Sequence, residues 1–154
     1  LRDGCAAKNV VTENSLPEVP IGMSTDRVLR AFPSYTADDN LTTSLGDCYY
    51  LRDTSANNGV NMMIVDDIVA RIDITESSTI TTDKGVGINS SKSEVINAYP
   101  QLVEQTHPYL GQAGQYLIVN LPSGYGIVFE TAFDIVTDYR LGRYPEVSYI
   151  EGCS

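Results

Sequence analysis

Hydrophobic residues recur at helical spacing in two short segments of this chain. In the first, Val28, Leu29 and Phe32 fall on one face of a helix that begins after Ser24, a residue type that caps helix N-termini. Pro33 follows directly, and we expect the helix to end there because the residue before a proline avoids the α region. The second segment shows the same design, including the spacing of a capping box, in Ser91, Glu94, Val95, Ile96, Tyr99 and Pro100.

After each helix and a polar stretch, the spacing of apolar residues changes to every second position, which is typical of β-strands. Ala70, Ile72 and Ile74 alternate with Arg71 and Asp73, so we expect a strand with one buried face. Turn-rich segments separate the strands, and sequential strands joined by short turns predict an antiparallel meander. The expected strands are residues 49–51, 60–65, 68–74, 79–82, 116–119, 127–132, 135–141 and 147–150.

The chain resembles itself at a spacing of 67 residues. Residues 21–85 align with residues 88–152 without a gap, and the identical positions fall where elements start, stop or turn. We therefore predict an α+β fold of two tandem helix-then-antiparallel-strands repeats that form one sheet with the helices on one face. The expected division is an N-terminal extension over residues 1–20, a first repeat over 21–86 and a second over 87–154, in one compact domain.

Two motifs carry a resemblance to known families. Residues 21–24 (Ile-Gly-Met-Ser), with Val28 and Pro33, and residues 87–91 (Gly-Ile-Asn-Ser-Ser), with Val95 and Pro100, each begin a capped helix ahead of a meander. This tandem arrangement resembles the β-lactamase inhibitor protein family and the small outer-membrane assembly lipoproteins. The end of the chain, residues 145–153, is similar to the ends of uncharacterised exported bacterial proteins.

The resemblance implies a fold and an exported setting, but it carries over no inhibited enzyme and no contact residue. The inhibitor family is expected to have a disulfide inside each repeat, which this chain cannot form. Its three cysteines, Cys5, Cys48 and Cys153, allow one bridge and one spare thiol. We expect Cys48, which opens the first strand, to bond Cys153, which follows the last. Pairing of Cys5 with either partner stays open.

Composition and charge restrict the class of partner. The formal net charge is −10, and without clustered Lys and Arg we expect no binding to nucleic acid or to anionic membranes. No apolar run of about 18 residues is present, so we expect no membrane insertion. The chain begins with Leu1 and not Met, so we expect that a signal segment is absent from this chain and that the protein is periplasmic or secreted.

No pattern in the sequence indicates a catalytic site, a metal or a cofactor. His107, the one histidine, lies in a polar connection without a nucleophile elbow in the chain, and we expect a surface loop there. Residues 38–40 (Asp-Asp-Asn) and 66–67 (Asp-Asp) could contribute oxygen ligands to calcium, but they lack the spacing of a calcium loop and indicate a solvated loop and a hairpin turn. We therefore expect a protein that is not an enzyme.

The predicted working surface is the sheet face opposite the helices. Arg71 and Asp73, with Asp138 and Arg140 at the equivalent positions, put mixed charge on that face, which suits an exposed surface. Tyr50 and Tyr116 on neighbouring strands would add aromatic contact area. We therefore predict an exported protein-binding module, such as an inhibitor or immunity protein. The alternatives are a small hydrolase or carbohydrate-processing enzyme, and a cell-envelope scaffold protein.

Overall fold

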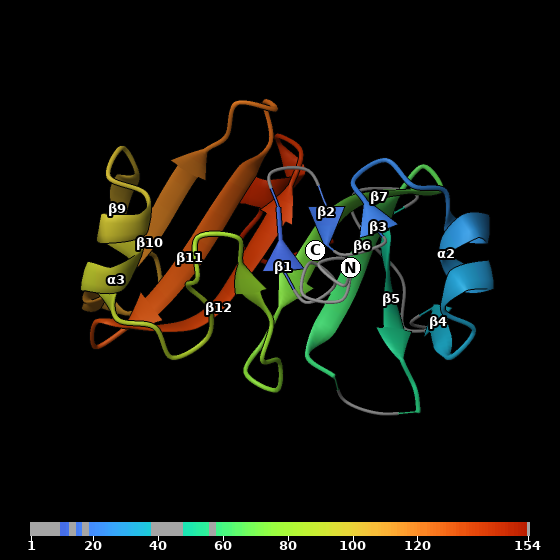
Figure 1. Ribbon diagram of the computed structural model, residues 1–154, viewed down its shortest axis with the longest axis horizontal. Coiled ribbons are helices and arrows are strands. Elements are labelled where there is room, and N and C mark those ends of the chain that lie inside the picture. The colour runs from blue at the N-terminus through green and yellow to red at the C-terminus, as the bar shows by residue number, and fades with distance from the viewer. Residues whose placement is uncertain (1–9, 13–14, 17–18, 38–47, 56–57, 154) are drawn as a thin grey trace, which may run out of the picture.

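The computed structural model describes residues 10–12, 15–16, 19–37, 48–55 and 58–153, and its centre is one eight-stranded antiparallel sheet (Figure 1). The strand order is β4-β5-β6-β7-β12-β11-β10-β9. These strands are β4 (Tyr35–Ala37), β5 (Tyr49–Asp53), β6 (Val60–Val65), β7 (Ile68–Ile74), β9 (Val103–His107), β10 (Gly111–Asn120), β11 (Gly126–Ala132) and β12 (Ile135–Gly142).

The remaining elements are short. Helices α2 (Thr25–Ala31) and α3 (Lys92–Ala98) lie towards opposite ends of the molecule, as Figure 1 shows. Neither of these helices in the described part of the chain is long and apolar enough to cross a membrane. The others are β1 (Val10–Val11), β2 (Ser15–Leu16), β3 (Val19–Pro20), β8 (Thr81–Thr82) and the 3₁₀ helix η1 (Glu146–Ser148).

One hydrophobic core lies between the sheet and the layer of helices and short strands. Val28 of α2 and Val95 of α3 are fully buried in a cluster that includes strand residues such as Phe129, and the N-terminal Val11 and Val19 belong to the same cluster. The segment expected as an extension, residues 1–20, therefore contributes two side chains to the core. Burial of branched side chains from both layers is the main stabilising contribution to such a fold.

Each helix begins at the serine that the sequence identified as a cap. The Ser24 hydroxyl accepts from the backbone N–H of Arg27, and the Ser91 hydroxyl accepts from that of Glu94. Glu94 also accepts from the backbone N–H of Ser91, which completes the predicted capping box. Both helices end two residues before a proline, at Ala31 and Ala98, as that residue's steric demand requires.

The fold class expected from the sequence is wrong. The protein is mainly β, with one eight-stranded sheet and two helices of seven residues each among the described residues, and not an α+β fold of two helix-then-strands repeats. The sheet does not separate at the expected division, because β7 pairs directly with β12. The physical reason is that each helix, ended early by its proline, is too short to cover the sheet without help from the short strands, so strand pairing sets the architecture.

Local geometry nevertheless recurs at the 67-residue spacing. The N–H of Gly22 donates to the carbonyl of Val69, and the N–H of Asn89 donates to that of Val136. The turns before β7 and β12 both hold two residues with positive φ: Asp66 and Asp67, then Phe133 and Asp134. The division into residues 21–86 and 87–154 as such stays a prediction.

Two expected strands take other forms, and two strands lie where a polar stretch was expected. Residues 79–82 yield only the two-residue β8, which pairs in parallel with β1. Of residues 147–150, the first two belong to the 3₁₀ helix η1 and the other two follow it without forming a strand. Strands β4 and β9 form the two edges of the sheet. An edge strand has a neighbouring strand on one side only and is more exposed to water, so a polar sequence is tolerated there.

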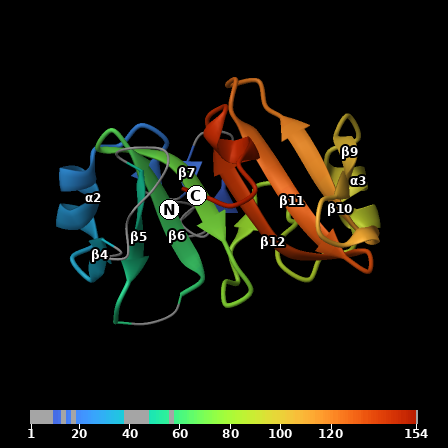
Figure 2. The ribbon, with the colours of Figure 1, turned by 180° about the vertical axis from the view of Figure 1, so that it is seen from behind.

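The chain after β12, residues 143–153, turns back across the sheet face that the helices leave open, and we call it the strap (Figure 2). A disulfide joins Cys153 near its end to Cys48, just before β5, with 5.6 Å between the Cα atoms. This is the pair that the sequence favoured, while Cys5 lies outside the described residues. The bond fixes the strap across both halves of the sheet.

We predict that removing this bridge, in C48S combined with C153S, lowers the free energy of unfolding by up to about 4–5 kcal/mol. The reason is that the bond spans a sequence separation of 105 residues and restricts the unfolded chain. Urea denaturation without reductant measures the effect, and Cys5→Ser is the control. Equal denaturation midpoints for the double variant and the control would contradict the prediction.

Candidate functional site

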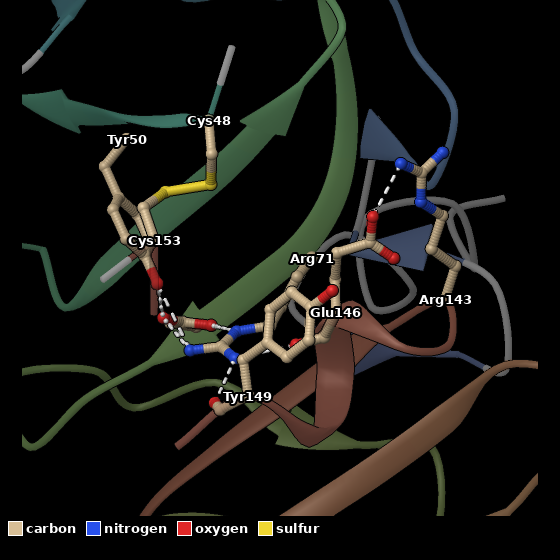
Figure 3. Close-up of a disulfide and its surroundings, with 8 residues drawn as sticks. Cys48, Tyr50, Arg71, Arg143, Glu146, Tyr149 and Cys153 are labelled. Carbon is tan, nitrogen blue, oxygen red and sulfur yellow. Dashed lines mark hydrogen bonds and ion pairs between the residues drawn. A yellow bond between two sulfur atoms is a disulfide. The ribbon is translucent and has the colours of Figure 1, made fainter. Parts of the chain in front are cut away.

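The strap is held to the sheet by a buried arginine in β7. Arg71 is 4% exposed, and its Nη1 donates to the backbone carbonyls of Glu146 at 2.9 Å and Tyr149 at 2.7 Å (Figure 3). Nε and Nη2 donate to the two carboxylate oxygens of Asp73 at 2.6 and 3.1 Å, which makes a bidentate ion pair. Nη2 also donates to Tyr50 Oη at 3.2 Å. The guanidinium thus joins the sheet and the strap through its full set of nitrogens.

The shifts in pKa follow from this burial. Burial acts to lower the pKa of Arg71, but the charge of Asp73 and its hydrogen bonds hold that pKa above the ordinary value. Tyr50 donates to Asp73 at 2.9 Å. Burial, followed by the charge of Asp73, raises the pKa of Tyr50, so the phenol stays neutral at physiological pH.

A second buried arginine, Arg140 of β12, holds the middle of the strap. It is 3% exposed, and its Nε donates to the carbonyl of Val147 at 2.7 Å. Its Nη1 pairs with Glu130, and its guanidinium carbon lies 5.4 Å from the ring centroid of Tyr116. Its Nη2 has no hydrogen-bond partner among the described residues. Val147 itself is fully buried against Tyr116 and Val128.

His107 is a structural residue, and the expectation of a surface loop there is wrong. It ends β9, is 8% exposed, and its Nδ1 accepts from the backbone N–H groups of Tyr109 at 3.1 Å and Leu110 at 3.2 Å. In the neutral imidazole the proton then lies on Nε2, which donates to Glu130 Oε1 at 3.2 Å. Both ring nitrogens therefore have hydrogen-bond partners within the fold.

The strap divides the open face of the sheet into two hollows. One is an apolar groove of about 460 Å³ between the strap and the β9 edge, bounded by Val103, Tyr116, Ile118, Val128, Tyr144 and Ile150 with several polar residues. The other is a polar hollow of about 330 Å³ near the β7–β12 junction, bounded by Tyr50, Asp73, Glu130, Asp138 and Glu151 among others. Arg140 lines both hollows.

The polar hollow contains a carboxyl group with an unusual affinity for protons. Burial, followed by the negative charge of Glu130, raises the pKa of Asp138 from 3.8 to about 6. The hydroxyl of Thr137 donates to Asp138 at 2.8 Å and offsets part of that shift. Among the residues that the structure describes, no three His, Cys, Asp or Glu side chains are grouped to hold a metal ion.

The structure places all six predicted binding residues on or beside the strap face, but the exposure assumed for them is wrong. Arg71, Arg140 and Tyr116 are buried under or beside the strap. Asp73, Asp138 and Tyr50 are half-buried. Charge reversal at either arginine would therefore lower the stability of the fold, because both side chains are buried in ion pairs.

Several residues that border the groove or contact the buried arginines were not predicted from the sequence. Val103 begins an edge strand in a stretch taken as a polar connection, and Glu130 and Glu146 gave no motif. The available signal was a period of two along residues 103–107, but this stretch is short and contains only one apolar residue, Val103. The strap was expected as a fourth strand, so its cover of the face was not anticipated.

No protein-family model matches the chain, and no curated protein matches it. Its fold is similar to an extracellular protein containing a SCP domain from Bacillus anthracis, with a TM-score of 0.58 and 8% identity over 80% of this chain and 44% of that chain. A cysteine-rich secretory protein from Staphylococcus aureus has a TM-score of 0.53 and 10% identity over 94% of this chain and 54% of that chain. The uncharacterised protein yfeY from Escherichia coli has a TM-score of 0.52 and 17% identity over 87% of this chain and 99% of that chain.

These structures correct the resemblance drawn from the sequence. The fold is shared with chains described as SCP-containing or secretory, and not with the β-lactamase inhibitor family or the small outer-membrane assembly lipoproteins. This chain spans about half the length of the first two, at 44% and 54%, and the low identities show similarity of fold alone. Serine caps and terminating prolines misled because they report helix ends, which many folds share.

We predict that Arg71→Gln lowers the free energy of unfolding by about 3–5 kcal/mol, because it leaves a largely buried Asp73 and two strap carbonyls without their donor. Arg27→Gln, at an exposed position of α2, is the control and should change it by no more than about 0.5 kcal/mol. Urea denaturation at pH 7 measures both. If the two variants prove equally stable, Arg71 does not hold the strap.

We predict that Asp138→Asn raises the melting temperature more at pH 8 than at pH 4. A carboxyl whose pKa is raised from 3.8 to about 6 binds its proton more tightly in the folded state. Its protonated form therefore stabilises the fold below pH 3.8, and this stability is lost as the pH rises through about 6. Asparagine mimics the protonated form at every pH. A difference between variant and wild type that is independent of pH would refute the assignment.

Proposed function

We propose that the chain is an exported protein-binding module whose working surface is the apolar groove between the strap and β9. The observation that carries this proposal is the groove itself, about 460 Å³ in volume and bordered by large apolar side chains that remain in water. Val103 is 49% exposed, Tyr144 43% and Ile150 44%. Apolar side chains gathered on one surface around a hollow are typical of binding sites.

The strap supports the same conclusion, because it is a peptide segment already bound to this face. Val147 packs on Tyr116 and Val128, and buried arginines donate to the strap's backbone carbonyls. Packing of an apolar side chain together with bonds to main-chain groups is the chemistry by which protein surfaces are recognised. The groove between the strap and β9 is lined by similar apolar side chains, but no segment of the described chain covers it.

Export is supported by the disulfide and by the described setting of two similar structures. A disulfide such as Cys48–Cys153 persists in oxidising compartments. One similar structure is described as extracellular and another as secretory. A periplasmic or secreted location agrees with both observations, and an inhibitor or immunity protein would be one form of such a module.

A small hydrolase is the second candidate, and the polar hollow is the observation that favours it. Asp138, whose pKa is raised to about 6, lies there with Glu130 and Asp73, and a carboxyl with such a pKa can donate a proton near neutral pH. Incubation with a panel of oligosaccharides separates the two functions. Turnover that Asp138→Asn abolishes, in a variant at least as stable as wild type, would favour the hydrolase.

We predict that a photo-cross-linking residue at Val103, on the rim of the groove, captures a protein from culture fluid or periplasmic extract. The matched control is the same residue at Ile96, which is 36% exposed on α3. Capture should be specific to position 103 because only that site lies on the proposed surface. Mass spectrometry of the cross-linked species identifies the partner.

A second variant separates binding at the groove from general adhesion. Val103→Glu places a charge on the groove rim and should reduce capture through a cross-linker at Tyr144 on the opposite rim. Because Val103 is 49% exposed, the melting temperature should stay within a few degrees. Equal capture from positions 103 and 96, or capture that Val103→Glu does not change, would show that the groove is not the binding surface.

A further inference from the structure

Strand β9 is an edge of the eight-stranded sheet and lies beside the apolar groove. It pairs with β10 on one side only, from Val103 opposite Ile118 to His107 opposite Gly111. Four of its five side chains are exposed, and His107 is the exception. Such an edge carries unpaired backbone groups that can pair with another chain.

Two hydrogen bonds establish which backbone groups of β9 face outwards. The N–H of Gln115 donates to Thr131 Oγ1 in β11, and the N–H of Leu121 donates to the carbonyl of Tyr125. Odd-numbered residues of this part of β10 therefore bond towards β11, and alternation turns Tyr116 and Ile118 towards β9. Their partners in β9, Gln105 and Val103, therefore direct their backbone groups towards β10. The alternate residues, Glu104 and Thr106, direct their N–H and C=O groups towards the outer edge.

A strand added at this edge would extend a row of side chains that ends in the groove. Val103, Ile118, Val128 and Arg140 lie directly opposite one another across four strands. The next position in that row belongs to the added strand, beside the 49%-exposed Val103. Side chains of paired strands at directly opposite positions are about 4.5–5.5 Å apart at Cβ, so an apolar residue there packs on Val103 and covers the rim of the groove.

The charges near this edge restrict the partner further. The chain carries a net charge of −10, and Glu130, Asp138 and Glu151 add carboxylates in the polar hollow at the Arg140 end of the row, on the same face of the sheet. Glu104 at the edge pairs with Lys92 of α3 at 2.6 Å. An acidic segment would meet repulsion here, whereas a segment with Lys or Arg beside its apolar residue would be attracted.

We infer that β9 receives an extended strand of the partner, with a branched apolar residue opposite Val103 and basic rather than acidic neighbours. The strand pairs with the outward backbone groups of Glu104 and Thr106, and its apolar side chain covers the groove. This inference rests on the proposed function and assigns the partner's chemistry at the same surface. Main-chain pairing supplies affinity and the groove supplies specificity, as in other cases of strand addition.

The test uses a phage-displayed library of random nonapeptides selected on the purified chain. The expected result is enrichment of sequences with Val or Ile at alternate positions and with Lys or Arg, and depletion of Asp, Glu and Pro. A selected peptide should lose at least about tenfold in affinity on Thr106→Pro, which removes one outward N–H and leaves the pairing with β10 in place. Thr106→Val keeps that N–H and should bind within about twofold of wild type.

Amide hydrogen exchange provides a readout that does not depend on a variant. Without peptide, the amides of Glu104 and Thr106 should exchange quickly, whereas those of Gln105 and Val103 should be protected by β10. The selected peptide should protect Glu104 and Thr106 specifically. If Thr106→Pro does not fold, this measurement on the wild-type chain decides the question.

Several outcomes would overturn the inference. No enrichment, enrichment of acidic sequences, or protection at residues other than Glu104 and Thr106 would each refute strand addition at β9. Binding of an oligosaccharide that protects these two amides equally well would assign the edge to a different class of ligand. If no peptide is selected while position 103 still cross-links a protein, the proposed function holds and only the extended-strand inference fails.

Discussion

A single buried guanidinium determines how the open face of this sheet is organised. Arg71 lies near the middle of the sheet, where its charge is stable only with a carboxylate and enough acceptors around it. Asp73 supplies the carboxylate, and the strap supplies the carbonyls of Glu146 and Tyr149. The strap must therefore lie across the centre of the face, and the groove beside β9 is the part that it leaves uncovered.

The junction between the two halves of the sheet relies on a reversal of charge. At the 67-residue spacing, Arg71 corresponds to Asp138 and Asp73 to Arg140. The antiparallel pairing of β7 with β12 then sets Arg140 directly opposite Asp73. Opposite charges at paired positions stabilise the junction, whereas identical residues at both copies would have put like charges together. Strands β7 and β12 therefore present opposite charges where they pair.

The strap also makes the two ends of the face different. Towards β5 the strap is joined to the sheet by the Cys48–Cys153 bond, and both cysteines pack on Met63 of β6, which is fully buried. Towards β9 only Val147 packs down, against Tyr116 and Val128, and the strand beyond them keeps its outer edge in water. If the proposed function holds, this difference would place recognition at the β9 end of the molecule.

The sequence by itself determined the features that depend on nearby residues. The serine caps, the helix ends before Pro33 and Pro100, the hairpin turns before β7 and β12 and the alternation along β7 follow from steric and hydrogen-bonding rules over a few residues. The cysteine pair followed from the position of each cysteine relative to the expected strands. The fold class was beyond such rules, because short helices and polar edge strands such as β9 carry little pattern.

Only the tertiary structure decided which face is covered and what covers it. Alternation in β7 shows that Arg71 points away from Ile72, but a period of two says nothing of whether water or another segment lies on that side. Here it is the strap that covers both arginines, and its contact with Arg71 comes from 75 residues further along the chain. Long-range cover of this kind depends on the path of the whole chain, and for that reason the exposed groove and its edge strand could be located only in the folded molecule.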